Sequence, residues 1–156
     1  MEHTAIADLD PFEHPAGATD GARALSDVLG TEEVALNHYT LEPGDACDGG
    51  YHTHLDQEEV FYVLSGAVTF DTEDGERVVE TDEVIRFAAG EYHHGQNEGD
   101  EAAEVLALGA PGARHDWGKI RVPVACPECE DVDALGVEFG SDGGSLRCPE
   151  CGTTVG

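Results

Sequence analysis

Basic residues are almost missing from this chain of 156 residues. Seven lysine and arginine residues face 34 aspartate and glutamate residues, so the formal net charge is −27. A nucleic-acid surface needs clustered positive charge to neutralise phosphates. The only modest concentration consists of Arg114, Lys119 and Arg121, and acidic residues dilute it. The composition therefore argues against a nucleic-acid partner.

Long apolar segments are also missing. No apolar run approaches the about 20 residues that a membrane-spanning helix needs, and the first residues carry neither the basic nor the apolar region of a secretory signal. We therefore expect a cytoplasmic protein with no membrane partner. A reducing cytosol keeps thiols unpaired, so closely spaced cysteine pairs favour metal binding over disulfides.

The acidic residues are spread along the whole chain, from Glu2 to Glu150. Repulsion between surface charges decays over a Debye length of roughly 10 Å in 0.1 M salt and about 3 Å at 1 M. We interpret the excess of acid as adaptation to the cytoplasm of a halophile rather than as a specific acidic binding surface.

The apolar residues are arranged as short runs between turn sequences, which is typical of an all-β protein. Residues 1–22 show no periodicity and are predicted to be irregular. The only hint of a helix is the segment 22–29, which could equally be a strand and a bend. We predict a β-barrel over residues 23–112, a linker over 113–122 and a small module over 123–156. The runs expected to form strands are 34–41, 60–64, 67–70, 78–79, 84–87, 105–108, 135–139 and 145–147.

Four residues in the barrel segment suit a metal site. His52 and His54 are two residues apart, so on a strand both imidazoles face the same side. Glu59 follows after a short bend, and His93 comes from a distant segment. Three imidazole nitrogens and one carboxylate would hold a divalent transition metal and leave positions open for water or a substrate.

The spacing of these residues resembles the cupin family. The first motif of that family has two histidines separated by one residue, then a glutamate, then a glycine, which His52, His54, Glu59 and Gly66 match. The resemblance covers about residues 34–110. It implies a double-stranded β-helix, or jelly-roll barrel, and it implies that His52, His54, Glu59 and His93 are the metal ligands.

The second cupin motif matches only in part. Gly90, His93 and Asn97 stand at the expected positions. Asp82 and Ala88 stand where the family has a glycine and a proline, and both of those positions shape the backbone. The departures therefore concern the geometry of turns and leave the ligands intact.

Several neighbouring residues leave alternatives open. Glu58 competes with Glu59, because a spacing of three residues after His54 also occurs in the family; the distance to Gly66 favours Glu59. Strand alternation does not separate the two glutamates, since both faces of the following strand are apolar. Four further residues have expected positions: His94 is expected to face solvent or support the ligands, Cys47 to be a spectator thiol, and His38 with Tyr39 to line the barrel or its rim.

The cysteines near the C-terminus form two identical knuckles. Cys126-Pro-Glu-Cys129 and Cys148-Pro-Glu-Cys151 can converge on one ion as a tetrahedron of four thiolates. These knuckles resemble those of zinc ribbons and rubredoxin-like domains. A closed shell of four ligands leaves no substrate position, so we expect a structural zinc site whose metal binding supplies folding energy on the order of 10 kcal/mol.

Two functions are compatible with these motifs. The first is a small-molecule metalloenzyme with oxygenase-type or isomerase-type chemistry at Fe, Mn, Ni, Cu or Zn in the barrel. The alternative is a barrel that binds or senses a small molecule without converting it, with the ribbon contacting a protein partner. A barrel whose metal only adds stability is a third possibility. We also expect a homodimer, formed through an edge strand near residues 34–41.

The charge predicts a dependence of folding on salt. Molar KCl should raise the melting temperature above its value in dilute buffer, because screening removes the repulsion between carboxylates. Thermal denaturation followed by circular dichroism in both buffers measures this. Equal melting temperatures would refute the halophilic interpretation.

Overall fold

The computed structural model describes residues 1–12, 18–140 and 143–155, and its regular structure is mostly β, as predicted. Within those ranges no helix is both long enough and apolar enough to cross a membrane. The elements in chain order are η1 (Ile6–Asp8), β1 (Ala22–Ala24), α1 (Leu25–Leu29), β2 (Ala35–Leu41), β3 (Thr53–His54), β4 (Glu58–Ser65), β5 (Ala67–Thr72), β6 (Arg77–Glu80), β7 (Val84–Phe87), β8 (His93–Gln96), β9 (Ala103–Ala110), η2 (Trp117–Lys119), β10 (Ile120–Val122), β11 (Leu135–Gly140), β12 (Gly143–Arg147) and β13 (Thr154–Val155).

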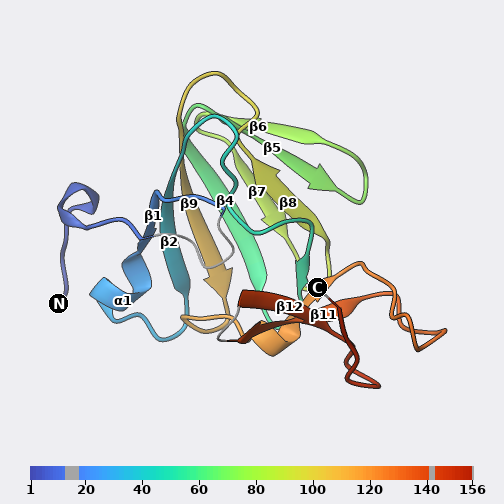
Figure 1. Ribbon diagram of the computed structural model, residues 1–156. Helices are drawn as coiled ribbons and strands as arrows, with labels where there is room; N and C mark the ends of the chain where they lie inside the picture. The colour runs from blue at the N-terminus through green and yellow to red at the C-terminus, as the bar shows by residue number, and fades with distance from the viewer. Residues whose placement is uncertain (13–17, 141–142, 156) are drawn as a thin grey trace.

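Two antiparallel sheets enclose the main core. The larger has the strand order β1-β2-β9-β4-β7 and the smaller has the order β6-β5-β8 (Figure 1). Burial alternates along β9, where Ala103, Val105 and Ala107 point inward, as expected for a strand with one face on a core. The predicted jelly-roll barrel is therefore confirmed.

The centre of the core is aromatic. The rings of Phe61, Phe70 and Phe87 come from three different strands, and their centroids lie 5.1 to 6.2 Å apart. Phe87 also stacks on the imidazole of His93, with centroids 4.2 Å apart and an interplanar angle of 12°. The hydrophobic core thus fixes the orientation of one predicted metal ligand.

The turns have the backbone conformations that the motifs require. Gly66 has φ +75°, and a Cβ there would lie 2.9 Å from the carbonyl oxygen of Ala102. Asp82, which replaces a motif glycine, has φ +66°. Aspartate tolerates this left-handed region better than most residues, and the Tyr62 hydroxyl donates to its Oδ1 at 2.8 Å. The substitution therefore retains a glycine-like turn.

The N-terminal elements protect the strand that we expected at the sheet edge. The segment 22–29 forms both a strand and a helix: β1 pairs with β2, and α1 ends at Gly30 in the left-handed conformation. Because β2 lies between β1 and β9, the prediction of an edge strand at residues 34–41 is wrong. The homodimer remains a prediction, but pairing through β2 no longer supports it.

The C-terminal residues continue a sheet that begins in the barrel. Strand β10 pairs with β3, placing Ile120 opposite His54, and its other side pairs with β11. The segment 113–122, predicted as a linker, thus includes η2 and β10. The hairpin of β11 and β12 lies across one end of the barrel (Figure 1). Its small core centres on Leu135, which is fully buried between Cys126 and Cys148.

The motif asparagine, Asn97, joins three segments at the other end of β8. It is 1% exposed, and its Nδ2 donates to the carbonyl oxygens of Leu41 and Glu101, both at 2.9 Å. Its Oδ1 accepts from the backbone N–H of Gly99 at 3.0 Å. Both N–H donors and the oxygen of the amide therefore have partners inside the protein.

Asn97→Asp should destabilise the barrel, because a carboxylate cannot donate to the two carbonyl groups. Leaving buried acceptors unpaired costs about 1–3 kcal/mol, and for a chain of this size roughly 2–4 °C of melting temperature is lost per kcal/mol. Gln96→Glu is the control, since the Gln96 amide makes one exposed hydrogen bond, to Gly44. Equal melting temperatures for the two variants would contradict this account of Asn97.

Candidate metal centre

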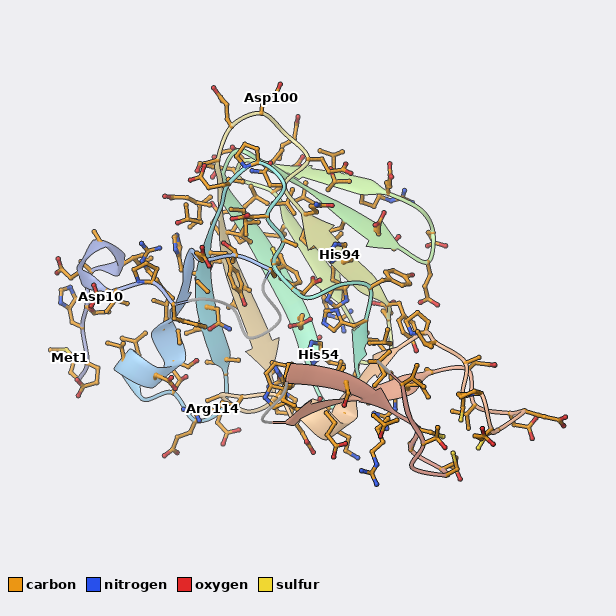
Figure 2. The ribbon with its side chains drawn as sticks, viewed as in Figure 1. Met1, Asp10, His54, His94, Asp100 and Arg114 are labelled. Carbon is orange, nitrogen blue, oxygen red and sulfur yellow. The ribbon has the colours of Figure 1, made fainter. Side chains whose placement is uncertain are left out.

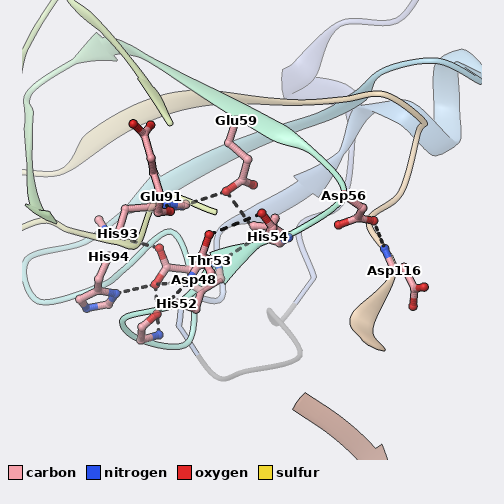
Figure 3. A network of polar contacts seen from close by, with 12 residues as sticks. Asp48, His52, Thr53, His54, Asp56, Glu59, Glu91, His93, His94 and Asp116 are labelled. Carbon is pink, nitrogen blue, oxygen red and sulfur yellow. Dashed lines mark hydrogen bonds and ion pairs between the residues drawn. The ribbon is translucent and has the colours of Figure 1, made fainter. Parts of the chain in front are cut away.

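The four predicted ligands of the barrel lie close together. Backbone hydrogen bonds in both directions join His52 to His93, at 3.0 and 2.9 Å, so the two residues sit directly opposite each other. His52 Nε2 lies 3.0 Å from His54 Nε2. Glu59 Oε2 lies 2.8 Å from His93 Nε2 and 3.4 Å from His54 Nε2. Figure 3 shows these side chains pointing toward one another from three segments.

The outer nitrogens of the imidazoles set their orientation. His52 Nδ1 lies 2.8 Å from the carbonyl oxygen of Gly50, and His93 Nδ1 lies 3.3 Å from that of Glu91. An imidazole that donates from Nδ1 presents the lone pair of Nε2 on its other side. The Nε2 atoms are therefore the ones available to an ion.

Unpartnered polar atoms at this point fit a bound cation. Glu59 Oε2 and His93 Nε2 are both buried and make no hydrogen bond among the described residues, despite their close approach. Buried polar atoms without a partner are rare and need an explanation. A divalent ion accepting electron pairs from both atoms satisfies them, and three nitrogens with one carboxylate oxygen are a suitable ligand set.

The electrostatics favour the metal-binding forms of two ligands, Glu59 and His54, whereas contact with the Glu59 carboxylate raises the pKa of His93 against the opposing effect of burial. Burial alone would raise the pKa of Glu59, but the imidazoles of His93, His54 and His52 outweigh it and lower the pKa to about 2. Burial lowers the pKa of His54 to about 4, against the opposing effect of Glu59. The carboxylate is thus ionised and His54 is neutral at neutral pH, as coordination requires.

The structure separates the two candidate glutamates. Glu59 points inward with Phe61 and Val63 of β4, both of which are core residues. Glu58 points outward, and its carboxylate accepts from Arg86 Nε at 2.6 Å. Only Glu59 therefore reaches the imidazoles.

Asp48 supports this site, and the sequence reasoning missed it. Its Oδ1 lies 2.5 Å from His94 Nδ1 and 3.9 Å from His52 Nδ1, while Oδ2 accepts from the backbone N–H of Gly95 at 3.2 Å. Asp48 thus ties the loop before β3 to β8. His94 faces away from the four ligands (Figure 3), consistent with the supporting role expected for it. The neighbouring Cys47 drew attention to this loop, but nothing in the local pattern singled out the aspartate.

A cavity of about 740 Å³ leads from the ligands to the C-terminal residues. Its inner end includes His52, His54 and Glu59, and its outer part includes residues of β10, β11 and β12. His54 lies at the end of the barrel that β12 crosses (Figure 2). His115 also lines the cavity, with its ring 4.9 Å from that of His54. His115 lies in the segment 113–122, which was predicted to be a linker, so the sequence offered only the presence of a histidine there as a sign of this position.

Other candidates take structural positions. Cys47 is 3% exposed in the core, and burial raises the pKa of its thiol well above the usual range, as expected for a spectator. Tyr39 lines the cavity, whereas His38 is buried and is not among the lining residues.

The four C-terminal cysteines form a second cluster. Cys126 Sγ lies 3.6 Å from Cys151 Sγ, and Cys129 Sγ lies 4.0 Å from Cys148 Sγ. A zinc tetrahedron with Zn–S bonds of about 2.3 Å has sulfur–sulfur edges of roughly 3.8 Å. Hydrogen bonding with Thr153 lowers the pKa of Cys151 to about 6, which favours the thiolate, whereas hydrogen bonding with Cys151 raises the pKa of Cys129 to about 12. The cluster therefore has the dimensions of a four-thiolate zinc site.

Comparison with known protein families finds a match within the barrel segment. Residues 37–109 match the model of a family described as cupin domain. Among curated proteins, none matches this chain.

Comparison with solved structures supports the same fold. A sugar phosphate isomerase of the cupin superfamily from Silicibacter pomeroyi has a TM-score of 0.66 and 20% identity, and the match covers 96% of this chain and 94% of that one. The polyketide cyclase RemF from Streptomyces resistomycificus has a TM-score of 0.63 and 18% identity, over 74% and 81% of the two chains. A provisionally named sugar phosphate isomerase from Acidithiobacillus ferrooxidans is 27% identical with a TM-score of 0.52, and the match spans only 57% of each chain.

Asp48→Asn should weaken metal binding at the barrel site about 10–100-fold, the range seen when residues that orient ligands are replaced. The physical reason is that Asp48 holds the loop before β3 against β8 and lies beside the outer nitrogen of His52. Competition with a chromogenic chelator measures the affinity. Asp100→Asn, which removes the same charge from the opposite end of the barrel (Figure 2), is the control. An unchanged affinity for Asp48→Asn would show that this aspartate does not orient the ligands.

Proposed function

We propose that this protein is a metalloenzyme that acts on a small molecule in its barrel, on the basis of the match of residues 37–109 to the cupin-domain family and of the geometry of the barrel site. The ligands would be His52, His54, Glu59 and His93. The observation that carries the proposal is the cluster of His52, His54 and Glu59 in the wall of a cavity of about 740 Å³, with His93 Nε2 2.8 Å from the Glu59 carboxylate.

The donor set points to a first-row divalent metal such as Fe, Mn, Ni, Cu or Zn. Such an ion supplies Lewis-acid polarisation of a substrate oxygen, or activation of dioxygen when it is redox active. With three neutral imidazoles and one carboxylate, a divalent centre keeps one net positive charge. An anionic or polarised oxygen of the substrate is therefore favoured over a cationic group.

The protein's own residues supply orientation. The contacts of His52 and His93 with backbone carbonyl oxygens hold their rings in place before a ligand arrives. Phe61 and Phe87 pack against the imidazole of His93, and Phe61 also lines the cavity. Within the proposal, a substrate reaches the ligands through the cavity, which His52, His54 and Glu59 line.

Isomerase-type and oxygenase-type reactions both suit this arrangement. The similar structures named as a sugar phosphate isomerase and a polyketide cyclase support a small-molecule substrate, although at 20% and 18% identity they share only the fold with this chain. Within the proposal, the cysteine cluster holds a structural zinc ion, because four thiolates leave no position for a substrate.

Elemental analysis of protein purified in molar KCl tests both sites. Wild-type protein should contain two metal ions per chain. His52→Ala/His93→Ala should lose one ion and Cys126→Ala/Cys148→Ala the other, since each pair removes half of one ligand set. The two double variants are controls for each other.

A single zinc ion that is lost only with the cysteines would overturn the metalloenzyme proposal. If both ions are present and metal-loaded protein binds candidate substrates without converting them, the barrel is a binding or sensing domain instead.

A further inference from the structure

Exposed apolar side chains gather on the outer wall of the cavity. Trp117, Val124 and Phe139 are 37%, 36% and 39% exposed, and all three line the cavity. They come from three different segments of the C-terminal part of the chain. Contiguous apolar surface of this kind marks a place where a ligand or partner is bound.

The rings of this wall form a continuous path from the metal ligands. His115 lies 4.9 Å from His54, Trp117 lies 4.4 Å from His115, and Phe139 lies 4.6 Å from Trp117, measured between ring centroids. The last two pairs are close to perpendicular, at 87° and 76°. A molecule whose polar end reaches the imidazoles would therefore lie with its body along aromatic rings.

The ribbon hairpin supplies the rest of this surface. Val137 and Leu146 line the cavity from β11 and β12, and Val155 adds to them from β13. Leu146 and Val155 also pack against the core around Leu135, between the cysteines. The same residues thus belong to the cysteine-bound module and to the wall of the barrel cavity.

Positive side chains are absent from this wall. Among the described residues that line the cavity there is no lysine or arginine, and the carboxylates Asp48 and Glu59 are present. Recognition of a phosphate group relies on arginine, lysine or the N-terminus of a helix. A phosphorylated ligand would therefore meet no compensating charge beyond the metal ion itself.

We infer that the ligand of this cavity is a flat, apolar molecule with adjacent oxygen atoms at one end and no phosphate group. The oxygen atoms would reach the metal centre, and the apolar body would pack against Trp117 and Phe139. The assignment of chelating oxygen atoms to the ligand rests on the proposed function, because it needs the barrel metal. The assignment of an apolar body rests on the cavity lining alone. The C-terminal ribbon is then the element that selects the substrate.

Three probes test this assignment by calorimetry on metal-loaded protein. Catechol has two adjacent oxygen atoms on one aromatic ring, and naphthalene-2,3-diol has the same two oxygen atoms on a two-ring body. Ribose 5-phosphate also has adjacent hydroxyl groups, but it carries a phosphate and no aromatic ring. The naphthalenediol should bind about tenfold more tightly than catechol, because the second ring is removed from water. It should also quench the fluorescence of Trp117, the only tryptophan.

The matched variants are Phe139→Ser and Phe12→Ser, which remove phenylalanines of almost equal exposure, 39% and 40%, inside and outside the cavity. Phe139→Ser should lower the affinity for naphthalenediol about tenfold and leave that for catechol within twofold. Phe12→Ser should change neither. Three results would overturn the inference: equal affinities for the two diols, binding of naphthalenediol without quenching of Trp117, or binding of ribose 5-phosphate more tightly than naphthalenediol.

A second pair of probes separates this inference from the proposed function. If the barrel holds no metal ion, the metalloenzyme proposal fails, but 2-naphthol and phenol still test the wall because neither needs a chelated ion. A preference for 2-naphthol that Phe139→Ser abolishes supports the apolar wall. The absence of that preference refutes it.

Discussion

The candidate metal centre depends on one pair of backbone hydrogen bonds. His52 and His93 exchange N–H and carbonyl bonds, at 3.0 and 2.9 Å, and this fixes two distant segments side by side. Residues directly opposite each other on antiparallel strands project their side chains to the same face. Because side chains alternate along a strand, His54 faces the same side as His52. Strand β4 brings Glu59 close to both imidazoles. The core phenylalanines pack behind these residues, so the hydrophobic core and the site form a single arrangement.

Strand β3 also connects the barrel to the C-terminal hairpin of β11 and β12. It carries His54, and its pairing with β10 begins the sheet that continues into β11 and β12. A small module with little core of its own relies on metal binding for its stability. Here that module forms part of the cavity wall, so a metal ion held by the four cysteines, as proposed, would support the geometry of that wall. The two sites are thus linked through the backbone and through shared apolar side chains.

Much of the fold and the residues of both sites could be predicted from local patterns. Alternating short apolar runs indicated strands because side chains alternate across a sheet with period two, and the observed strands overlap those runs. The histidine spacing placed His52 and His54 on one face for the same reason. The cysteine knuckles indicated a cluster because two intervening residues let two thiolates converge. Each of these inferences uses only neighbours along the chain.

The remaining features depend on contacts between distant segments. Both faces of β4 are apolar in sequence, so the choice of Glu59 over Glu58 required knowing which face covers the core. Asp48 and His115 join the site only because a loop and an apparent linker fold back beside β3 and β8. The position of β1 against β2, which removes an expected edge, is a long-range pairing that no local period encodes. Short-range periodicity therefore determines strands and ligand spacing, whereas long-range strand pairing determines which side chains meet.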